Sequence, residues 1–442
     1  MKYSKAVKKA VALFVLTAVV ITVFPQVSLL ALSDTDLNSD DPYSVINTYS
    51  VDPSVPSYAE YVSSHESVYP HKTISVTSSD ICRYEKAGIS TSPELYSDYE
   101  GFSGESIYTG EEDIIEFSFK VEESGFYYPR LRYYPVEGKT SEIQRAFFID
   151  GELPYEELSL IKFNRIWQTD ISGTYVDDQG ITVKEWKTDN QGFQVKPESV
   201  EAPEWCERFF FDSNGYITSP LAVYLEAGEH TLTMIAQKEP VLIGSLEFTY
   251  KDELKAYSDY LAGNSGLPDT PGQFIRIEAE NASKMSSQML YPRQDQSSPL
   301  VYPSSPKLLL NNTIGGTSWQ SAGQWIEWEF DAPEDGYYNI SAYCKQNFVR
   351  GIDVCRKIYI DGEVPFEEMS DYGFGYSQSW REEILSDREG NPYSFYLAKG
   401  HHTIRMEVVL GDMAEVISSV QDTVQLLNGI YRSVIYITGV SP

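Results

Sequence analysis

The chain is poor in cysteine, histidine and basic residues. Its 442 residues include 4 Cys, 5 His and 34 Lys or Arg, against 65 Asp or Glu, which gives a formal net charge of −31 at pH 7. A protein this acidic lacks the basic surface that nucleic-acid phosphates require, so we exclude nucleic acid as a partner. A negatively charged chain with a mean hydropathy of −0.32 favours neutral or cationic partners instead.

Motifs for catalysis are also missing. The sequence holds no G-x-S-x-G and no H-E-x-x-H, and Gly315-Gly316 lacks the lysine that follows the glycines of a phosphate-binding loop. The cysteines show neither C-x-x-C spacing nor paired histidines, which argues against a zinc site. The adjacent acids Glu156-Glu157 and Glu367-Glu368 would point apart in an extended chain, so we assign them a structural role. We therefore predict that the protein is not an enzyme.

Long apolar runs are confined to the N-terminus. Residues 10–24 are apolar, follow four lysines and precede Ala31-Leu32-Ser33, whose small residues suit cleavage by signal peptidase. We predict a secretory signal peptide at 1–33, with an uncleaved anchor as the alternative. Residues 34–56, rich in Ser, Asp and Pro, are predicted to form a disordered tether. The expected location is extracellular, either secreted or associated with the cell surface.

The chain repeats itself at long range. GFYY at 125–128 returns as GYYN at 336–339, and IDGELPYEE at 149–157 returns as IDGEVPFEE at 360–368, both 211 positions later. A constant offset over this distance indicates two copies of one domain. We place module 1 at 57–250, a linker at 251–272 and module 2 at 273–442. The first half of the linker, Asp252–Leu261, suits a short helix.

A second match shows that the copies differ in length. YLEAGEHTL at 224–232 returns as YLAKGHHTI at 396–404, an offset of only 172, so module 1 holds 39 additional residues (211 − 172). We assign this insertion to about 177–214, a segment that contains Trp186 and Trp205.

Both copies have the patterning of β-structure. Apolar and polar residues alternate over Ile114–Val121 and Trp325–Phe330, and Asp-Gly follows an apolar strand in each copy, which is typical of tight hairpins. The predicted fold is all-β, with two tandem antiparallel β-sandwiches of the jelly-roll type. Met413–Leu427 shows helical spacing and predicts a short helix near the C-terminus. We expect a last strand at Val434–Thr438.

The cysteines leave two alternatives open. Cys82 and Cys206 lie in module 1, and Cys344 and Cys355 lie in neighbouring predicted strands of module 2. Export permits disulfides, so a bridge between Cys344 and Cys355 is consistent with the sequence. Free thiols buried in strands are equally consistent.

Candidate binding residues gather in module 2. Sugar recognition uses flat aromatic faces together with planar polar groups. Aromatic candidates are Trp319, Phe374, Tyr376 and Trp380, and a nearby loop supplies Gln346, Asn347 and Arg350. Core packing is the alternative for each aromatic residue. Glu278 and Glu280 alternate across Ala279, so in a strand they would share one face and either bind a cation or face solvent.

Several of these motifs resemble known families. IEAEN at 277–281, GQW at 323–325, DGYY at 335–338 and KGHHTI at 399–404 resemble the carbohydrate-binding modules of families 6 and 35, which are galactose-binding-like jelly rolls. The stretch from LLLNNTIGG at 308–316 to ITG at 437–439 is similar to the N-terminal tandem modules of large extracellular solute-binding proteins of sugar ABC transporters. RKIYIDGEVPF at 356–366 is the densest part of this similarity.

The resemblance implies both a ligand and a metal. It adds Asn311 and Asn312 to the predicted ligand-binding residues, and it implies a structural calcium held in module 2 by Glu278 and Glu280. No Asp or Glu lies between Ser433 and Pro442, where the family usually has a third acidic ligand. The aligned positions in module 1 are Thr77 and Ser79, so no calcium is expected there.

These observations lead to two functional hypotheses. The first is a non-catalytic protein that binds an oligosaccharide or polysaccharide, as part of an extracellular sugar-capture or ABC uptake system. Its partners would be the sugar and an ABC transporter or solute-binding domain. The alternative is a pair of structural spacer domains that dock or present a solute-binding domain and bind no ligand.

Overall fold

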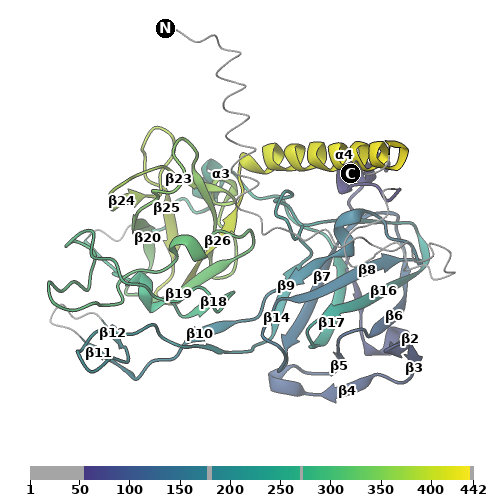
Figure 1. Cartoon of the computed structure of the whole chain (residues 1–442), viewed down its shortest axis with the longest axis horizontal. Coiled ribbons are helices and arrows are strands. Elements are labelled where there is room, and N and C mark those ends of the chain that lie inside the picture. Colours follow the sequence, from purple (N-terminus) through teal and green to yellow (C-terminus); the bar gives the residue numbers. More distant parts are fainter. Residues whose placement is uncertain (1–53, 177–181, 269–271, 439–442) are drawn as a thin grey trace, which may run out of the picture. The chain divides into compact units, whose positions relative to one another are not determined.

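A computed structural model of the protein describes residues 54–176, 182–268 and 272–438. The predicted signal peptide, most of the predicted tether and residues 177–181 of the insertion lie outside the described residues. The described chain consists mainly of antiparallel β-sheets (Figure 1), so the prediction of an all-β sandwich fold with a C-terminal helix is confirmed. Among the described helices, none combines the length and the apolar character needed to cross a membrane.

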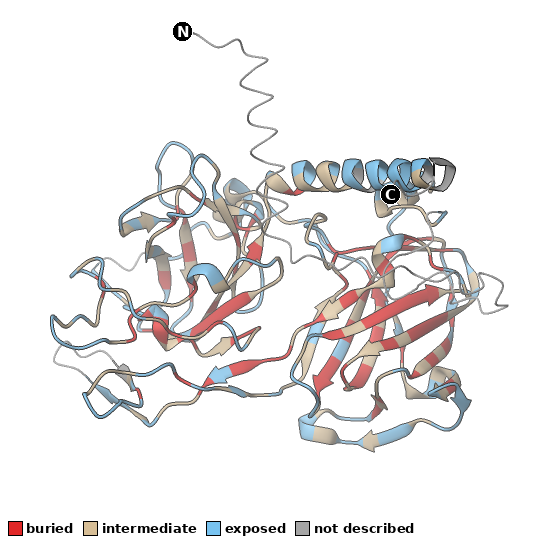
Figure 2. Ribbon diagram, viewed as in Figure 1, coloured by how far each residue is buried: buried red, intermediate tan, exposed pale blue. Residues whose placement is uncertain are grey.

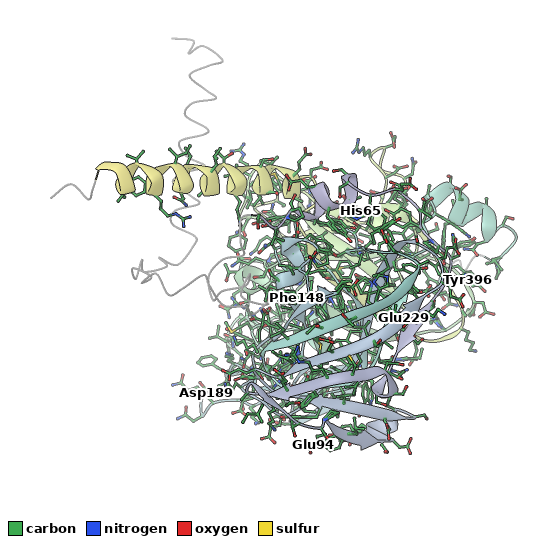
Figure 3. The ribbon with its side chains drawn as sticks, turned by 90° about the vertical axis from the view of Figure 1, so that its right-hand side faces the viewer. His65, Glu94, Phe148, Asp189, Glu229 and Tyr396 are labelled. Atoms are coloured by element: carbon green, nitrogen blue, oxygen red, sulfur yellow. The ribbon has the colours of Figure 1, made fainter. Side chains whose placement is uncertain are left out.

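Module 1 contains two antiparallel sheets. The first sheet runs in the order β14 (Cys206–Phe209), β7 (Gly125–Pro135), β17 (Val241–Thr249), β5 (Glu105–Thr109) and β4 (Glu94–Ser97), with β1 (Ile74–Val76) on β17 and β15 (Val223–Leu225) on β7. The second sheet runs in the order β3 (Ile89–Ser90), β2 (Ile81–Lys86), β6 (Ile114–Val121), β16 (Gly228–Lys238), β8 (Ile143–Ile149) and β9 (Ile161–Phe163). Figure 3 looks onto this second sheet, which carries Phe148 and Glu229.

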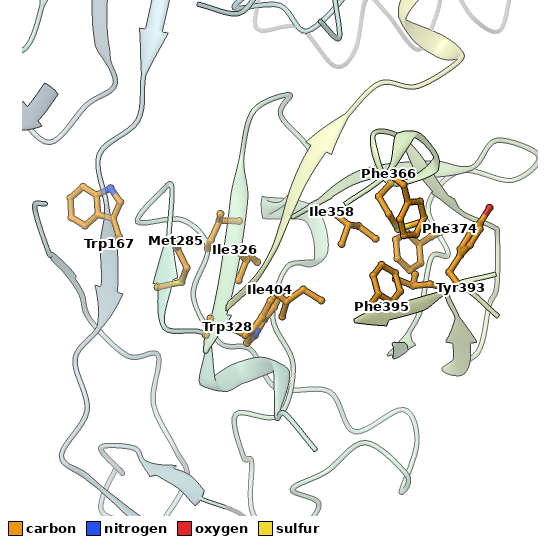
Figure 4. Packing of buried hydrophobic residues seen from close by; sticks show 14 residues of the cluster. Trp167, Met285, Ile326, Trp328, Ile358, Phe366, Phe374, Tyr393, Phe395 and Ile404 are labelled. Atoms are coloured by element: carbon orange, nitrogen blue, oxygen red, sulfur yellow. The ribbon is translucent and has the colours of Figure 1, made fainter. Parts of the chain in front are cut away.

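Module 2 is built on one long sheet and two strand pairs. The sheet runs in the order β18 (Lys284–Met285), β19 (Trp325–Ala332), β26 (Gly400–Val409), β22 (Val354–Ile360) and β23 (Tyr372–Phe374), and β10 (Trp167–Thr169) and β13 (Ser199–Glu201) extend it beyond β18. The pairs are β20 (Gly336–Asn339) with β25 (Ser394–Leu397) and β21 (Ser341–Cys344) with β24 (Arg381–Ile384). Side chains from the sheet and from β25 share one core, in which Ile326, Ile358 and Phe395 are fully buried (Figure 4).

The repeat seen in the sequence returns in the strand register. In module 1, β16 places Met234 opposite Ile115 and Leu232 opposite Ile149. In module 2, β26 places Met406 opposite Ile326 and Ile404 opposite Ile360. Every one of these positions is related to its counterpart by the offset of 172 or 211, so the two copies share the same three-stranded unit, β6-β16-β8 and β19-β26-β22.

Each copy holds a histidine at its Asp-Gly turn. Asp361 has φ +53°, and its carboxylate binds the His402 Nδ1 at 2.7 Å, while the His402 Nε2 lies 2.6 Å from the Ala398 carbonyl. Module 1 repeats this arrangement with Asp150 and His230. Both ring nitrogens of His402 face acceptors, which favours the doubly protonated, cationic ring. Burial opposes this charge, but the hydrogen bonds to Ala398 and Asp361 outweigh it and raise the pKa of His402.

Each copy also begins with a short helix fixed by tyrosines. In α3 (Tyr257–Gly263) the hydroxyl oxygens of Tyr257 and Tyr260 accept hydrogen bonds from the backbone N–H groups of Ser394 (2.8 Å) and Tyr396 (2.9 Å) in β25. In α2 (Tyr58–Ser63), Tyr58 and Tyr61 bind β15 and the residue before it in the same way. Helix α3 therefore packs against the core of module 2, although the sequence placed it in a linker.

The repeated acidic pairs bind the N-terminal ends of these helices. Glu157 accepts a hydrogen bond from the backbone N–H of Tyr58, and Glu368 accepts one from the backbone N–H of Tyr257. A carboxylate at the first turn of a helix interacts favourably with the exposed N–H groups there. The second acid of each pair thus anchors the helix.

The remaining described elements are one strand pair, several short 3-10 turns and the C-terminal helix. Strands β11 (Gly173–Val176) and β12 (Thr182–Glu185) pair with one another, and six 3-10 turns complete the described chain: η2 (Ser78–Asp80), η3 (Tyr99–Gly101), η4 (Glu156–Ser159), η5 (Ala279–Asn281), η6 (Gly316–Ser318) and η7 (Glu367–Met369). Helix α4 spans Met413–Thr438, which confirms the predicted helix and extends it. The predicted strand at Val434–Thr438 is wrong, because these β-branched residues continue the helix.

The tyrosine contacts can be tested by removing one oxygen. Tyr260→Phe leaves the Tyr396 N–H without its acceptor while the ring still fills its space. An unpaired buried donor costs about 1–3 kcal/mol, so we expect the free energy of unfolding in urea to fall by about that amount. Tyr175→Phe is the control, because the Tyr175 side chain is half exposed. An equal loss of unfolding free energy in both variants would contradict a stabilising hydrogen bond between the Tyr396 N–H and the Tyr260 hydroxyl.

The histidine contact predicts a pH dependence. Because the pKa of His402 is raised above 6.5 in the folded state, its stabilisation is fully present below pH 6.5 and is lost as the pH rises through the folded pKa. We expect His402→Gln to be less stable than the wild type at low pH, with the difference shrinking as the pH rises. The measurement is the free energy of unfolding from about pH 5 to about pH 9. His401→Gln, at an exposed neighbouring position, should reproduce the wild-type profile.

Candidate functional site

Two aromatic rings stack on the surface of module 2. Strands β21 and β24 are paired so that Tyr343 lies opposite Glu382 and Cys344 lies opposite Arg381. Trp380 directly precedes β24, two positions from Glu382, so its side chain falls on the same face as Tyr343. The two rings stack with centroids 5.7 Å apart and planes inclined by 20°. We call Tyr343 and Trp380 the aromatic platform.

The platform is open to solvent and has polar groups at its edge. Tyr343 is 41% exposed, and Phe348 on the adjoining loop is 65% exposed. The indole N–H of Trp380 is buried and has no hydrogen-bond acceptor among the described residues. Because this atom is enclosed by the protein, the hydroxyl groups of a ligand on the platform would meet the polar side chains of the adjoining loop instead.

A half-buried ion pair borders the platform. The Lys345 ammonium lies 5.1 Å from the centre of the Trp380 ring and 2.7 Å from the Asp295 carboxylate. Burial would raise the pKa of Asp295, but the hydrogen bonds from Lys345 and Ser297 lower it to about 2. The pair therefore stays charged at neutral pH and holds the polar edge in one geometry.

The predicted polar ligands divide into exposed and structural residues. Asn347 and Arg350 are exposed on the loop that carries Phe348. Gln346 is buried, donates to the carbonyls of Val349 and Ile352, and accepts the backbone N–H of Phe348. Its amide thus fixes the shape of the loop and does not face solvent.

The two predicted asparagines are also structural. The Asn311 side chain is buried and donates to the Val195 carbonyl at 3.3 Å. The buried Asn312 amide donates to the carbonyls of Asp295 and Pro303 and accepts the Asp295 N–H. Asn312 therefore positions the partner of Lys345 without itself reaching the surface.

Of the predicted aromatic ligands, only Trp380 joins the platform. Phe374 is buried in the core, and Trp319 packs against that core with its indole N–H bound to the Gln324 carbonyl and the Arg356 guanidinium 4.2 Å from its ring. Tyr376 is half-buried. Sequence reasoning missed Tyr343, because a single tyrosine in a four-residue strand carries no signal until strand pairing places it beside Trp380.

The acidic pair of module 2 is not in a strand, contrary to the prediction. Glu278 precedes and Glu280 lies within the 3-10 turn η5, and both are buried. Burial and then the charge of Glu278 raise the pKa of Glu280 to about 8. The Arg276 Nε lies 2.6 Å from Glu278, and the Lys184 ammonium donates to the neighbouring Ala282 carbonyl. Positive charge thus reaches this turn from the protein itself.

Calcium binding at this turn stays a prediction of the resemblance. Calcium takes about six to eight oxygen ligands, and the described residues contain no group of three or more His, Cys, Asp or Glu that could hold a metal ion. The two carboxylates face basic groups and not a ring of oxygen ligands. The binding proposed below therefore does not depend on calcium.

The four cysteines are unbonded in the described chain. Cys344 in β21 pairs with β24, whereas Cys355 in β22 pairs with β23 and β26, so the two residues do not lie on adjacent strands. Burial raises the pKa of both thiols to about 11. Neither is activated as a nucleophile.

A pocket lies apart from the platform. Its volume is about 290 Å³, and its lining includes Lys162, Asn164, Arg208 and Gln324 together with Trp167. The platform, by contrast, is an open surface. An open aromatic surface suits a long ligand that passes over it, whereas small molecules are usually held in concave sites.

Comparisons with known proteins gave no family assignment. No protein-family model and no curated protein matches the chain. Similar solved structures include the Podospora anserina GH26-CBM35 β-(1,4)-mannanase, with 12% identity over 48% of this chain and 32% of the mannanase and a TM-score of 0.23. The chain thus spans about a third of the length of that enzyme.

Two isolated modules are also similar. The C-terminal CBM6 of the Zobellia galactanivorans laminarinase LamC matches with 11% identity over 40% of this chain and 99% of that module, with a TM-score of 0.20. The CBM6 of Cellvibrio mixtus lichenase 5A, in complex with cellotriose, matches with 12% identity over 40% of this chain and 97% of that module, with a TM-score of 0.21. At TM-scores this low, the matches carry no argument about this chain.

The buried acid predicts a second pH effect, which has the same sign as that of His402. Because the pKa of Glu280 is raised from 4.5 to about 8, the folded state keeps a proton that the unfolded state loses, and stability falls as the pH rises from 4.5 through about 8. Glu280→Gln mimics the neutral acid, so we expect it to be more stable than the wild type at high pH and similar to it at low pH. The measurement is the free energy of unfolding against pH. Glu329→Gln, at an exposed position of β19, is the matched control, and the prediction fails if both variants behave alike.

Proposed function

We propose that the protein binds an oligosaccharide or polysaccharide on the aromatic platform of module 2, without chemistry of its own. The observation that carries this proposal is the stack of the exposed Tyr343 on the half-buried Trp380. The exposed Asn347 and Arg350 lie on the adjoining loop. The sequence motifs that resemble carbohydrate-binding modules support the same class of ligand. The N-terminal pattern and the resemblance to solute-binding proteins support a role outside the cell, in sugar capture or ABC uptake.

The platform offers each contact that a sugar requires. The apolar C–H face of a sugar ring lies flat against an aromatic face and loses its contact with water there. The exposed Asn347 and Arg350 on the adjoining loop then supply hydrogen-bonding groups for the hydroxyl groups of the sugar. The Lys345–Asp295 pair keeps this edge rigid, which reduces the entropy that binding costs.

Module 1 does not repeat the platform. The positions that lie 211 residues before Tyr343 and Lys345 are Arg132 and Tyr134, and Arg132 stacks on Phe102 within 5.0 Å. Tyr134 is buried. We therefore assign sugar binding to module 2 and a scaffolding role to module 1.

One observation favours the alternative of a spacer without ligand. Gln346, Asn311, Asn312 and Phe374, four of the predicted ligand residues, hold loops or fill the core. These contacts are the ones a purely structural domain also needs. The two functions differ in one respect, because only sugar binding requires the surface formed by Tyr343 and Trp380 to stay accessible.

A glycan-array screen tests the proposal. We expect the wild type to bind a defined set of glycans and Trp380→Ala to bind them at least about tenfold more weakly, equivalent to ~1.4 kcal/mol. Phe348→Ala is the matched control, because this exposed ring lies outside the platform, and it should lose much less. A parallel screen with added calcium, on the wild type and Glu280→Gln, tests the metal that the resemblance implies: a response confined to the wild type would assign calcium to Glu280, and equal behaviour of the two would remove it.

Two results would count against the proposal. A blank array with folded protein, under both calcium conditions, would leave the spacer role as the better account. Binding that survives in Trp380→Ala would show a sugar site elsewhere on the protein.

A further inference from the structure

Helix α4 is long and largely uncovered. It spans Met413–Thr438, and most of its described residues are exposed, as the pale blue of its ribbon in Figure 2 shows. The exposed apolar residues are Val416, Val424, Leu426, Leu427, Ile430, Tyr431 and Val434, with exposed fractions of 40–66%. Monomeric soluble proteins seldom leave an apolar surface of this extent open, and such surfaces usually mark contacts with a partner.

The helix contacts the rest of the chain through a different face. Ala414 is buried, and Gln421, seven residues on, accepts a hydrogen bond from Tyr216. Residues seven apart share one face of a helix. The helix is therefore held along this face, and the apolar residues remain available on another.

Four of the seven exposed apolar residues lie on a seven-residue repeat: Val416, Leu427, Ile430 and Val434. Taking Met413 as position a, the a positions are Met413, Val420, Leu427 and Val434, and the d positions are Val416, Thr423, Ile430 and Ile437. Seven of these eight residues are apolar, which is the pattern of helices that pack against other helices in a coiled coil. A sheet edge or a lipid surface does not require this spacing.

The charges on α4 select its partner. Within Met413–Thr438 the ionisable residues are Glu415 and Asp422 at c positions, Arg432 at an f position and the tyrosines. The flanking e and g positions carry no charge, so two such helices can approach without repulsion despite the net charge of −31. A helix with one arginine and no lysine lacks the basic face that binds anionic membranes.

We propose that α4 pairs with α4 of a second copy of this chain and that the protein is a homodimer. The a and d rows are self-complementary, as a twofold-symmetric interface requires. The helix is 26 residues long, which at 1.5 Å per residue gives about 39 Å of contact. The dimer does not depend on sugar binding, but it would bring two platforms together and raise the avidity for a polysaccharide.

Sedimentation equilibrium on the protein purified after expression of the full chain tests this pairing. A thiol reductant is included so that the exposed Cys82 cannot cross-link two copies. We expect the wild type to show twice the mass of the chain. The double variant Leu427→Gln, Ile430→Gln replaces one a and one d residue by a helix-compatible polar residue and should show the monomer mass.

Control measurements separate loss of pairing from loss of folding. Arg432→Gln introduces the same residue at an outer position of the same helix and should remain dimeric. The thermal unfolding of the modules in the double variant, followed by near-ultraviolet circular dichroism, should retain the cooperativity of the wild type. A monomeric wild type at the highest soluble concentration overturns the proposal, as does a dimer that the double variant leaves intact. A wild type that stays monomeric but floats with phosphatidylcholine vesicles would assign α4 to a membrane surface and overturn it as well.

Discussion

The fold of module 2 depends on satisfying the backbone N–H groups at the free side of β25. This strand pairs with β20 alone, so its other row of donors needs acceptors. The hydroxyl groups of Tyr257 and Tyr260 supply them, and Glu368 in turn anchors the first turn of the helix that carries both tyrosines. In module 1 the tyrosines of α2 accept the corresponding hydrogen bonds from β15 and the residue before it. This constraint explains why the tyrosines, the acidic pair and the strand recur together in both copies.

The aromatic platform follows from this frame by a short chain of contacts. Strand β20 leads directly into β21, and the pairing of β21 with β24 brings Tyr343 and Trp380 together. Buried amides then shape what surrounds the rings, since Gln346 folds the adjoining loop and Asn312 positions Asp295 against Lys345. These polar residues thus hydrogen-bond to the backbone and hold the loops around the platform in place. A ligand would contact only a few surface side chains, and these are positioned by buried residues that the ligand does not contact.

Two buried groups of opposite chemistry make the folded state less stable as the pH rises. His402 is stabilised as a cation between two acceptors, whereas Glu280 is stabilised as a neutral acid by its burial. The first contribution fades as the pH rises through the neutral range, and the second is lost over an overlapping range. Both effects disfavour the folded state at alkaline pH. The net charge of −31 adds a general repulsion in the same direction.

The repeat, the β-rich fold, the Asp-Gly turns and the helix from Met413 could all be predicted from the amino-acid sequence, because each depends on local spacing or on a comparison of the chain with itself. Sequence reasoning misplaced the strand at Val434–Thr438, where β-branched residues continue a helix, and the strand at Glu278 and Glu280, which is a tight turn. Which aromatic residues reach the surface could be read only from the folded chain. Phe374 and Trp380 are only six positions apart, yet one fills the core and the other stacks on Tyr343. Burial depends on strand pairing between distant segments, and that pairing leaves no trace in the local pattern.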